Sequence, residues 1–144
     1  MTTGKTAIFK EDGVTPADPF DYGSGRIDLS KAGLASAAAV PSIVGFGHQE
    51  SHGVVSKTQS FTLTDLTGAA HAYSVGVSGP SGAVSFSVSP SSVTIPANGT
   101  ATITVSLTST GVTLSGPFQD FEADVTISGN GGPTLLVPLW VRFQ

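Results

Sequence analysis

The chain of 144 residues contains no cysteine, and this absence removes several kinds of chemistry at once. A disulfide scaffold, a zinc site built on thiolates and a cysteine nucleophile are all excluded. Charge is also scarce, since 11% of the residues are charged and the formal net charge at pH 7 is −4. A negative chain is poorly suited to neutralising phosphates, so we expect no nucleic-acid binding. No apolar run approaches the roughly 20 residues that span a bilayer, so we expect no membrane insertion.

Hydroxyl side chains and glycine take the place of the missing charges. Apolar residues make up 39% of the chain, which is enough for a hydrophobic core at this length. Serine and threonine suit the solvent-facing side of strands, so the composition favours a β-rich extracellular domain. We therefore expect a secreted or cell-surface location.

Apolar and polar residues alternate from Pro41 onwards, which is typical of strands with one buried face. In the clearest run, Ile103 and Val105 alternate with Thr102 and Thr104. Strands are predicted near residues 42–46, 58–65, 71–78, 83–88, 92–95, 100–108, 120–128 and 134–143. This number and spacing of strands predicts an all-β fold, an immunoglobulin or fibronectin III-like β-sandwich. Because an antibody-type Cys–Trp–Cys core is impossible, we favour the fibronectin-like variant.

Residues 1–40 have a different pattern, and we separate them from a sandwich at residues 41–144. The first segment is irregular, with a little helix. Ser30, or alternatively Asp28, is expected to cap a short helix that runs to about Ala38. The segment has too few large apolar residues to form a core of its own, so we expect it to lean on another part of the protein.

One stretch of this segment has an unusual sequence, Phe20-Asp21-Tyr22-Gly23-Ser24-Gly25-Arg26-Ile27-Asp28-Leu29. It resembles the closing segment of the peptidase domain in the subtilisin-like serine proteases, the subtilases. In that family, an aromatic-Asp-Tyr-Gly-(Ala/Ser)-Gly run follows the helix that carries the nucleophilic serine. The opening Met1-Thr2-Thr3-Gly4 fits the same register.

The order of the remaining pieces is also similar to that of subtilases. Several branches of the family attach a fibronectin III-like domain directly after the peptidase domain. The strand at 121–127, followed by Leu136-Val137-Pro138-Leu139-Trp140-Val141, resembles the end of that domain. Ala123 stands where a small residue or glycine is common. The resemblance implies that residues 1–40 are the C-terminal remnant of a peptidase domain, and that the sandwich is a non-catalytic accessory module of a secreted serine endopeptidase.

Subtilase catalysis needs an aspartate, a histidine and a serine, placed so that the imidazole accepts the serine proton. The family supplies them in Asp-(Ser/Thr)-Gly, His-Gly-Thr-His and Gly-Thr-Ser-Met motifs, and none of these occurs in the chain. His52-Gly53-Val54 shares only two letters with the histidine motif. We therefore assign no catalytic residue and expect no peptide hydrolysis by this chain.

We also predict no metal site and no cofactor. His48 and His52 have a spacing that binds metal on a helix, but their surroundings predict a loop, so they are interpreted as polar loop residues. Several acidic residues could be imagined as a calcium cluster, although no ligand loop with alternating oxygen donors is readable. Turn and cap roles are favoured for them. These residues are Glu11, Asp12, Asp18, Asp21 and Asp28.

The resemblance implies one partner, the peptidase domain of the parent protein, and six residues form the candidate domain interface. They are Phe20, Tyr22, Ile27, Leu29, Leu136 and Trp140. In a regular last strand Trp140 points outward and forms an apolar patch with Leu136. A bulge at Pro138 would instead turn Trp140 inward, and the sequence leaves both arrangements open.

The alternative, from a different functional class, is that the chain is a bacterial cell-surface adhesion or carbohydrate-binding module. Sugar sites offer exposed aromatic rings beside polar groups, and the candidates here are Tyr22, Tyr73 and Trp140. In either case we expect the chain to be a monomer.

Overall fold

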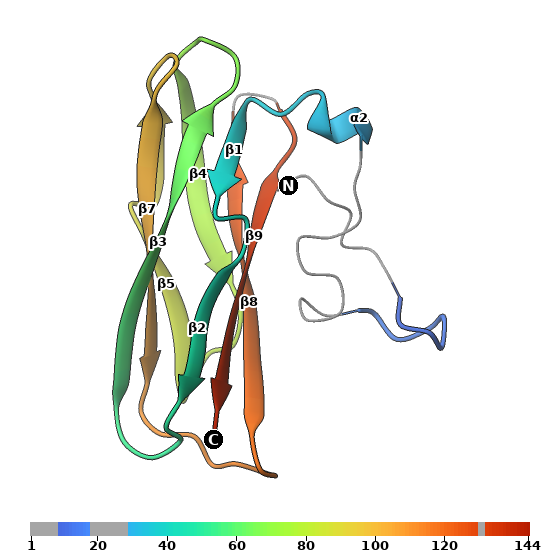
Figure 1. Ribbon diagram of the computed structural model, residues 1–144, viewed down its shortest axis with the longest axis vertical. Coiled ribbons are helices and arrows are strands. Elements are labelled where there is room, and N and C mark those ends of the chain that lie inside the picture. The colour runs from blue at the N-terminus through green and yellow to red at the C-terminus, as the bar shows by residue number, and fades with distance from the viewer. Residues whose placement is uncertain (1–8, 18–28, 130–131) are drawn as a thin grey trace.

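Two β-sheets pack face to face in the computed structural model, which describes residues 9–17, 29–129 and 132–144 (Figure 1). One sheet has four strands in the order β1-β3-β7-β5, and the other has five in the order β2-β9-β8-β4-β6. Their bounds are β1 (Ala37–Val40), β2 (Val44–Gln49), β3 (Val55–Asp65), β4 (His71–Ser78), β5 (Val84–Ser89), β6 (Ser92–Ile95), β7 (Thr100–Ser109), β8 (Gln119–Ser128) and β9 (Leu135–Phe143). The predicted all-β immunoglobulin-like sandwich is confirmed.

The core lies between the two sheets, because each strand turns its apolar residues inward. Ile103, Val105 and Leu107 of β7 are fully buried, and Leu139 and Val141 of β9 face them from the other sheet. The intervening threonines and serines lie on the outer faces. This is the arrangement that the two-residue period predicts.

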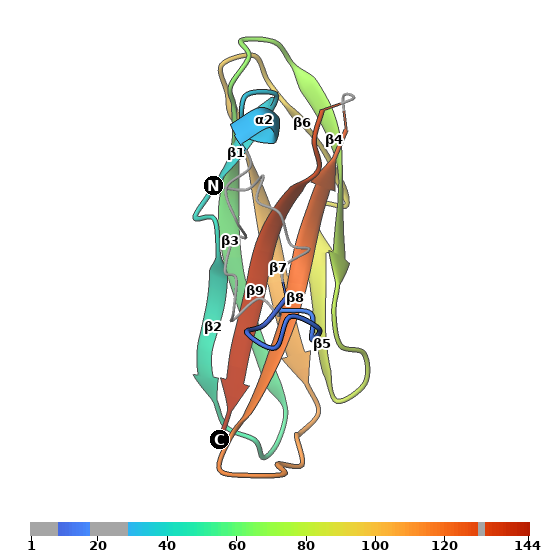
Figure 2. The ribbon, with the colours of Figure 1, turned by 90° about the vertical axis from the view of Figure 1, so that its right-hand side faces the viewer.

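Neighbouring strands of the described chain run antiparallel, except that β2 lies parallel to β9. The described chain passes from the four-stranded to the five-stranded sheet four times, between β1 and β2, β3 and β4, β5 and β6, and β7 and β8. Figure 2 looks onto the face of the five-stranded sheet, with β2, β9, β8 and β4 side by side. The cis peptide bonds Val40–Pro41 and Ser89–Pro90 lie at the β1–β2 and β5–β6 crossings.

The helix predicted to reach Ala38 is wrong in its length. The helix α2 (Leu29–Ala32) ends at Ala32, and Ala37–Val40 forms strand β1 against β3. Alanine favours helices intrinsically, but Ala37 and Ala39 are buried beside β3, and the backbone of Ser36 accepts a hydrogen bond from Leu66 N. Tertiary pairing therefore overrides local propensity, and the sheet begins four residues before the predicted boundary at 40/41.

Segment 9–17 forms a small turn. Phe9 and Pro16 form an isolated bridge, and Lys10 N donates to Thr15 O at 2.8 Å. The Asp12 carboxylate accepts hydrogen bonds from Val14 N and Thr15 N, the turn role expected for an acidic side chain here. The described segments contain no helix of the length and apolar character needed to cross a bilayer.

Candidate functional site

The outward-facing residues of β9 form the first candidate surface. Leu136, Pro138, Trp140 and Arg142 alternate with inward residues that are buried; of the four, Pro138 is also buried and the others are partly exposed. We call these four residues the outer row. The pairing of β8 with β9 continues without a register shift from Gln119↔Phe143 to Ile127↔Leu135. There is consequently no bulge at Pro138, and of the two arrangements left open, the one with Trp140 on the outer face is present.

Trp140 lies against a glycine of the neighbouring strand. Gly45 is its partner in β2, and a Cβ atom built on Gly45 would stand 2.6 Å from Trp140 Nε1 and 2.8 Å from Cε2. Such distances are shorter than van der Waals contact, so the absence of a side chain at residue 45 is what leaves room for the ring. The indole is therefore half-buried, although it lies on the outside of the sheet.

An acidic row accompanies the apolar one. Asp120, Glu122 and Asp124 lie on the outer face of β8, opposite Arg142, Trp140 and Pro138 respectively. Asp120 and Arg142 form a two-pronged ion pair, with Nε–Oδ1 and Nη2–Oδ2 distances of 2.7 Å. The hydrogen bonds that Arg142 donates to the Asp120 carboxylate raise the pKa of Arg142.

The same arginine lies 4.0 Å from the ring centre of Phe118, a cation–π contact. Its guanidinium group is thus fixed between an acid and an aromatic ring. The outer row therefore has an apolar stretch, Leu136 to Trp140, followed by the positively charged Arg142, whose side chain is held in place.

The other interface candidates belong to the first segment. Leu29, in α2, is 78% exposed. Phe20, Tyr22 and Ile27 lie outside the residues that the structure describes, as do Asp18, Asp21 and Asp28. Only Leu29, Leu136 and Trp140 can therefore be placed, and Leu29 comes from the helix that precedes the sandwich.

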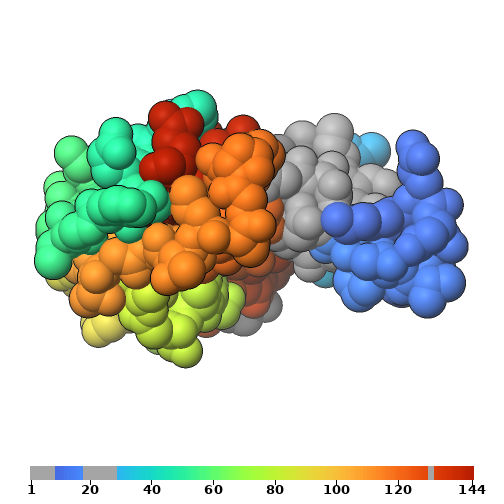
Figure 3. Space-filling model, turned by 90° about the horizontal axis from the view of Figure 1, so that it is seen from below, coloured from blue at the N-terminus to red at the C-terminus, as the bar shows by residue number. Residues whose placement is uncertain are grey.

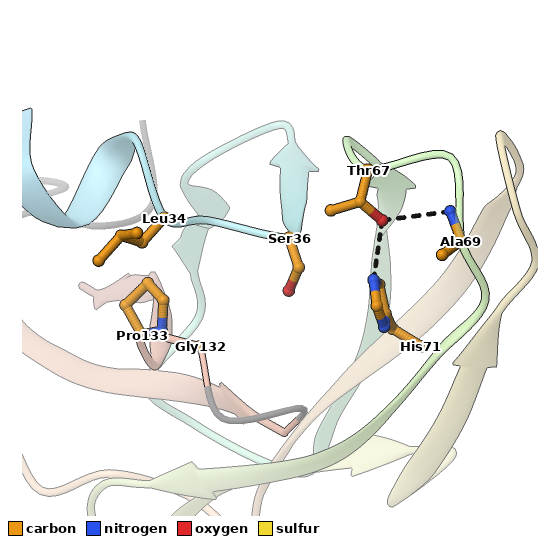
Figure 4. A pocket seen from close by; sticks show the side chains of 7 residues that line it. All are labelled: Leu34, Ser36, Thr67, Ala69, His71, Gly132 and Pro133. Atoms are coloured by element: carbon orange, nitrogen blue, oxygen red, sulfur yellow. Dashed lines mark hydrogen bonds between the residues drawn. The ribbon is translucent and has the colours of Figure 1, made fainter.

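A cavity of about 680 Å³ lies at one end of the sandwich (Figure 4). Leu34 and Pro133 form an apolar wall, and Thr67 and His71 stand opposite. Thr67 Oγ1 is 2.8 Å from His71 Nε2 and also donates to Asp65 Oδ1 at 2.9 Å. A catalytic triad needs the acid on the second nitrogen of the histidine, whereas Asp65 bonds the hydroxyl instead. The arrangement is therefore a structural turn.

Asp65, which was not predicted from the sequence as a candidate residue, holds this end of the sandwich together. Its carboxylate accepts hydrogen bonds from the backbone N–H groups of Thr67, Gly68 and Asn98, which join the β3–β4 and β6–β7 turns. These hydrogen bonds, first that from Thr67, hold the pKa of Asp65 well below its usual range. The local string Asp65-Leu66-Thr67-Gly68 is a readable turn signal, but the contact with Asn98 is not.

The opposite end of the sandwich is formed by loops that lie side by side (Figure 3). Val112 N donates to Ser51 O and Thr110 N donates to Ala83 O, which ties three loops together. A second cavity of about 550 Å³ is lined here by Ser51, His52 and residues 110–114.

The two histidines that were weighed as metal ligands are separated by the structure. His48 lies in β2, next to Arg142 in register, whereas His52 lies in the following loop, where its Nδ1 is 3.1 Å from Ser51 Oγ. Within residues 9–17, 29–129 and 132–144, no three histidine or acidic side chains are grouped to hold a metal ion.

The fold and these surfaces define the class of the protein, an immunoglobulin-like β-sandwich. No family model and no curated protein matches the sequence. The solved structure of the chaperone–tip adhesion subunit complex CsuC–CsuE from Acinetobacter baumannii matches with a TM-score of 0.50 and 10% identity, over 74% of this chain and 56% of that chain.

Two further structures are similar. The VesB protease of Vibrio cholerae matches with a TM-score of 0.50 and 17% identity, over 81% of this chain and 33% of that one. The ASH/PapD-like domain 7 of human CEP192 matches with a TM-score of 0.48 and 9% identity, over 76% and 84%. At such identities the likeness is one of fold. This chain spans about half of the matched chaperone chain and a third of the protease chain.

Proposed function

We propose that the chain is a non-catalytic accessory module of a secreted subtilisin-like serine protease, and that it packs on the peptidase domain. The proposal starts from the sequence resemblance at Phe20–Leu29 and in the last two strands. The observation that supports it most is the outward Trp140. A large, partly exposed aromatic ring on the same outer face as Leu136 is the kind of anchor that domain interfaces use.

Three further features support a packing role. The exposed Leu29 lies just before the sandwich and offers a second apolar contact. The described residues bring no serine, histidine and aspartate into a triad, and Asp65, the acid nearest to a histidine–hydroxyl pair, is occupied by turn amides. The fold likeness to the VesB protease adds that a sandwich of similar shape occurs within the chain of a protease.

The first test is the coding sequence that precedes Met1. A Gly-Thr-Ser-Met element upstream, with the aspartate and histidine motifs before it, is the expected result. An unrelated upstream sequence, or an initiator context with no further coding sequence, contradicts the proposal.

The second test measures the contact directly. The upstream peptidase segment and this chain are co-expressed as two polypeptides, and the chain is captured through a tag on the peptidase segment. Trp140→Glu is expected to weaken capture by tenfold or more, because an interface tryptophan contributes on the order of 2 kcal/mol. Ser56→Glu, on an exposed position of the other sheet, is the matched control. Equal capture of the wild-type and Trp140→Glu chains would contradict the proposed interface.

The alternative of a carbohydrate-binding module loses one of its aromatic candidates. Tyr73 is 4% exposed, and its hydroxyl is hydrogen-bonded to Ser36 Oγ, so it belongs to the core. Trp140 remains, with Glu122 opposite it. Binding to a glycan array that is abolished by Trp140→Ala would favour this alternative over domain packing.

A further inference from the structure

The strand β5 is an edge of the four-stranded sheet. It pairs with β7 on one side, and in the described part of the chain no strand pairs with its other side (Figures 1 and 2). An open edge presents unpaired backbone N–H and C=O groups, which can template another strand. The open edge of β5 is therefore a candidate binding surface for a further strand.

The hydrogen-bond pattern shows which backbone groups face outward. Thr110 N donates to Ala83 O at 2.9 Å, which makes residues 83 and 110 a hydrogen-bonded pair of the β5–β7 ladder. Hydrogen-bonded and non-hydrogen-bonded pairs alternate along an antiparallel ladder. The backbone N–H and C=O groups of Ser85, Ser87 and Ser89 therefore bond to β7. It follows that the N–H and C=O groups of Val84, Phe86 and Val88 point to the open edge.

The other edges carry features that discourage pairing. The strands β1 and β6 have four residues each, and prolines follow both. The pairing of β2 shifts in register, and Gly47 in it has a φ of +68°. The part of β3 beyond β1 contains the exposed Lys57. Each of these features is a known protection of sheet edges.

Of these protections, β5 has only the proline that follows it, Pro90. Residues 84–89 contain no charge, no proline and no glycine, and the register with β7 is regular. Phe86 and Val88 are only partly buried, although they pack against the core. The edge thus combines free backbone groups with apolar surface that remains in contact with water.

The sequence of β5 is symmetric about Phe86. Residues 84–88 read Val-Ser-Phe-Ser-Val in both directions. We propose that two copies of the chain pair through β5, antiparallel and about a two-fold axis at Phe86, so that the two four-stranded sheets become one continuous sheet. Phe86 then faces Phe86 of the second copy, and Val84 faces Val88.

In the symmetric register, all the outward-facing backbone N–H and C=O groups of β5 form hydrogen bonds. All three outward-facing residues meet outward-facing residues, and each pair exchanges two N–H···O=C hydrogen bonds. The exposed parts of Phe86 and Val88 are covered at the same time. A foreign extended peptide could also bind the edge. In a second copy, however, the two-fold axis itself places each outward-facing residue of β5 opposite an outward-facing residue of the other β5. This proposal departs from the monomer expected from the sequence, and it does not depend on the proposed accessory function.

A charge-reversal experiment tests the register. In the symmetric pair, Ser85 lies opposite Ser87 of the second copy, in a non-hydrogen-bonded pair, where side chains approach closely. The double variant Ser85→Lys/Ser87→Lys places like charges opposite each other twice. The variant Ser85→Lys/Ser87→Glu changes the same positions but places opposite charges together. Both lose the Ser85 Oγ–Thr108 Oγ1 hydrogen bond, so this loss cancels in the comparison.

Sedimentation velocity over a wide concentration range supplies the readout. The wild-type chain is expected to move from 14.5 kDa at low concentration to twice that mass at high concentration. The Lys/Lys variant is expected to stay at the mass of one chain, and the Lys/Glu variant to associate. The control Ser56→Lys/Ser60→Lys, on β3, is expected to associate like the wild type. Thermal unfolding of dilute samples checks that each variant is folded.

Amide exchange provides an independent measurement on the wild-type protein. The amides of Val84, Phe86 and Val88 are expected to exchange rapidly when dilute and slowly when concentrated, while those of Ser85 and Ser87 are protected throughout by β7. A single-chain mass at all concentrations overturns the proposal. So does association that both double variants of β5 retain, or that the β3 control abolishes. Protection of the three amides only on adding an unrelated extended peptide would assign the edge to another partner instead.

Discussion

The contact between Gly45 and Trp140 gives the sharpest prediction, because adding one methyl group should disturb one ring. In Gly45→Ala the new Cβ would lie 2.6 Å from Nε1 and 2.8 Å from Cε2 of Trp140. Heavy atoms in contact normally stand ~3.5–4.0 Å apart, so the ring has to move by about 1 Å. Over-packing of this kind costs about 1–3 kcal/mol, and the half-exposed indole can swing toward solvent, so we expect ~1–2 kcal/mol.

The same substitution should behave differently when the ring is absent. Gly45 has no positive φ, so alanine fits its backbone. In a Trp140→Ala background, Gly45→Ala is expected to stabilise the fold by ~0.4–1 kcal/mol, because alanine restricts the unfolded chain more than glycine does. The double-mutant cycle should therefore show a coupling of ~1.5–3 kcal/mol between the two positions.

Urea unfolding followed by circular dichroism measures the four free energies of the cycle. Trp140 is the one tryptophan of the chain, so its emission reports the ring directly, and Gly45→Ala should shift it to longer wavelength. Gly116→Ala, where a Cβ meets no atom within 4 Å, is the matched control and should stabilise the fold by the same ~0.4–1 kcal/mol without shifting the emission. An equal effect of Gly45→Ala with and without Trp140 would refute the reasoning.

Three other predictions concern stability. Leu139→Ala should cost ~2–5 kcal/mol of unfolding free energy, whereas Leu136→Ala, one outward position of the same strand, should cost ~1 kcal/mol or less, and equal losses would contradict the assigned faces. Because folding lowers the pKa of Asp65, its stabilisation is present above the ordinary aspartate pKa of ~3.9 and is lost as the pH falls below it. The stability gap between the wild type and Asp65→Asn should therefore narrow below about pH 4, and a gap that is constant with pH would argue against this role. Gly129→Ala places a Cβ 2.3 Å from the backbone oxygen of Ala72, which cannot swing aside, so we expect a loss of about 3 kcal/mol or more in thermal or urea unfolding, and unchanged stability would disprove the close approach.

Much of this fold could be predicted from the local sequence pattern. The alternation of apolar residues with serine and threonine identified eight of the nine strands in the described part of the chain, with ends that differ by a few residues, and it assigned inward and outward faces correctly. The strand it missed, β1, is rich in alanine, whose local preference is helical. Only pairing with β3, which is distant in sequence, makes Ala37 to Val40 extended.

The candidate surfaces could be predicted only in part. The sequence placed Trp140 and Leu136 on one face if the last strand was regular, but the regularity itself depends on the β8–β9 register. The role of Asp65 was not predictable beyond its own turn, because Asn98 approaches it from a different hairpin.

The amino-acid sequence by itself determined the strand content, the faces of the strands and the kinds of chemistry that are missing, because period and composition act within a few residues. The tertiary structure alone decided that Trp140 lies on Gly45, that Asp65 joins two turns and that β5 forms an open edge. These features depend on which strands become neighbours. That choice is made by contacts between distant segments, when the two sheets close on a shared core.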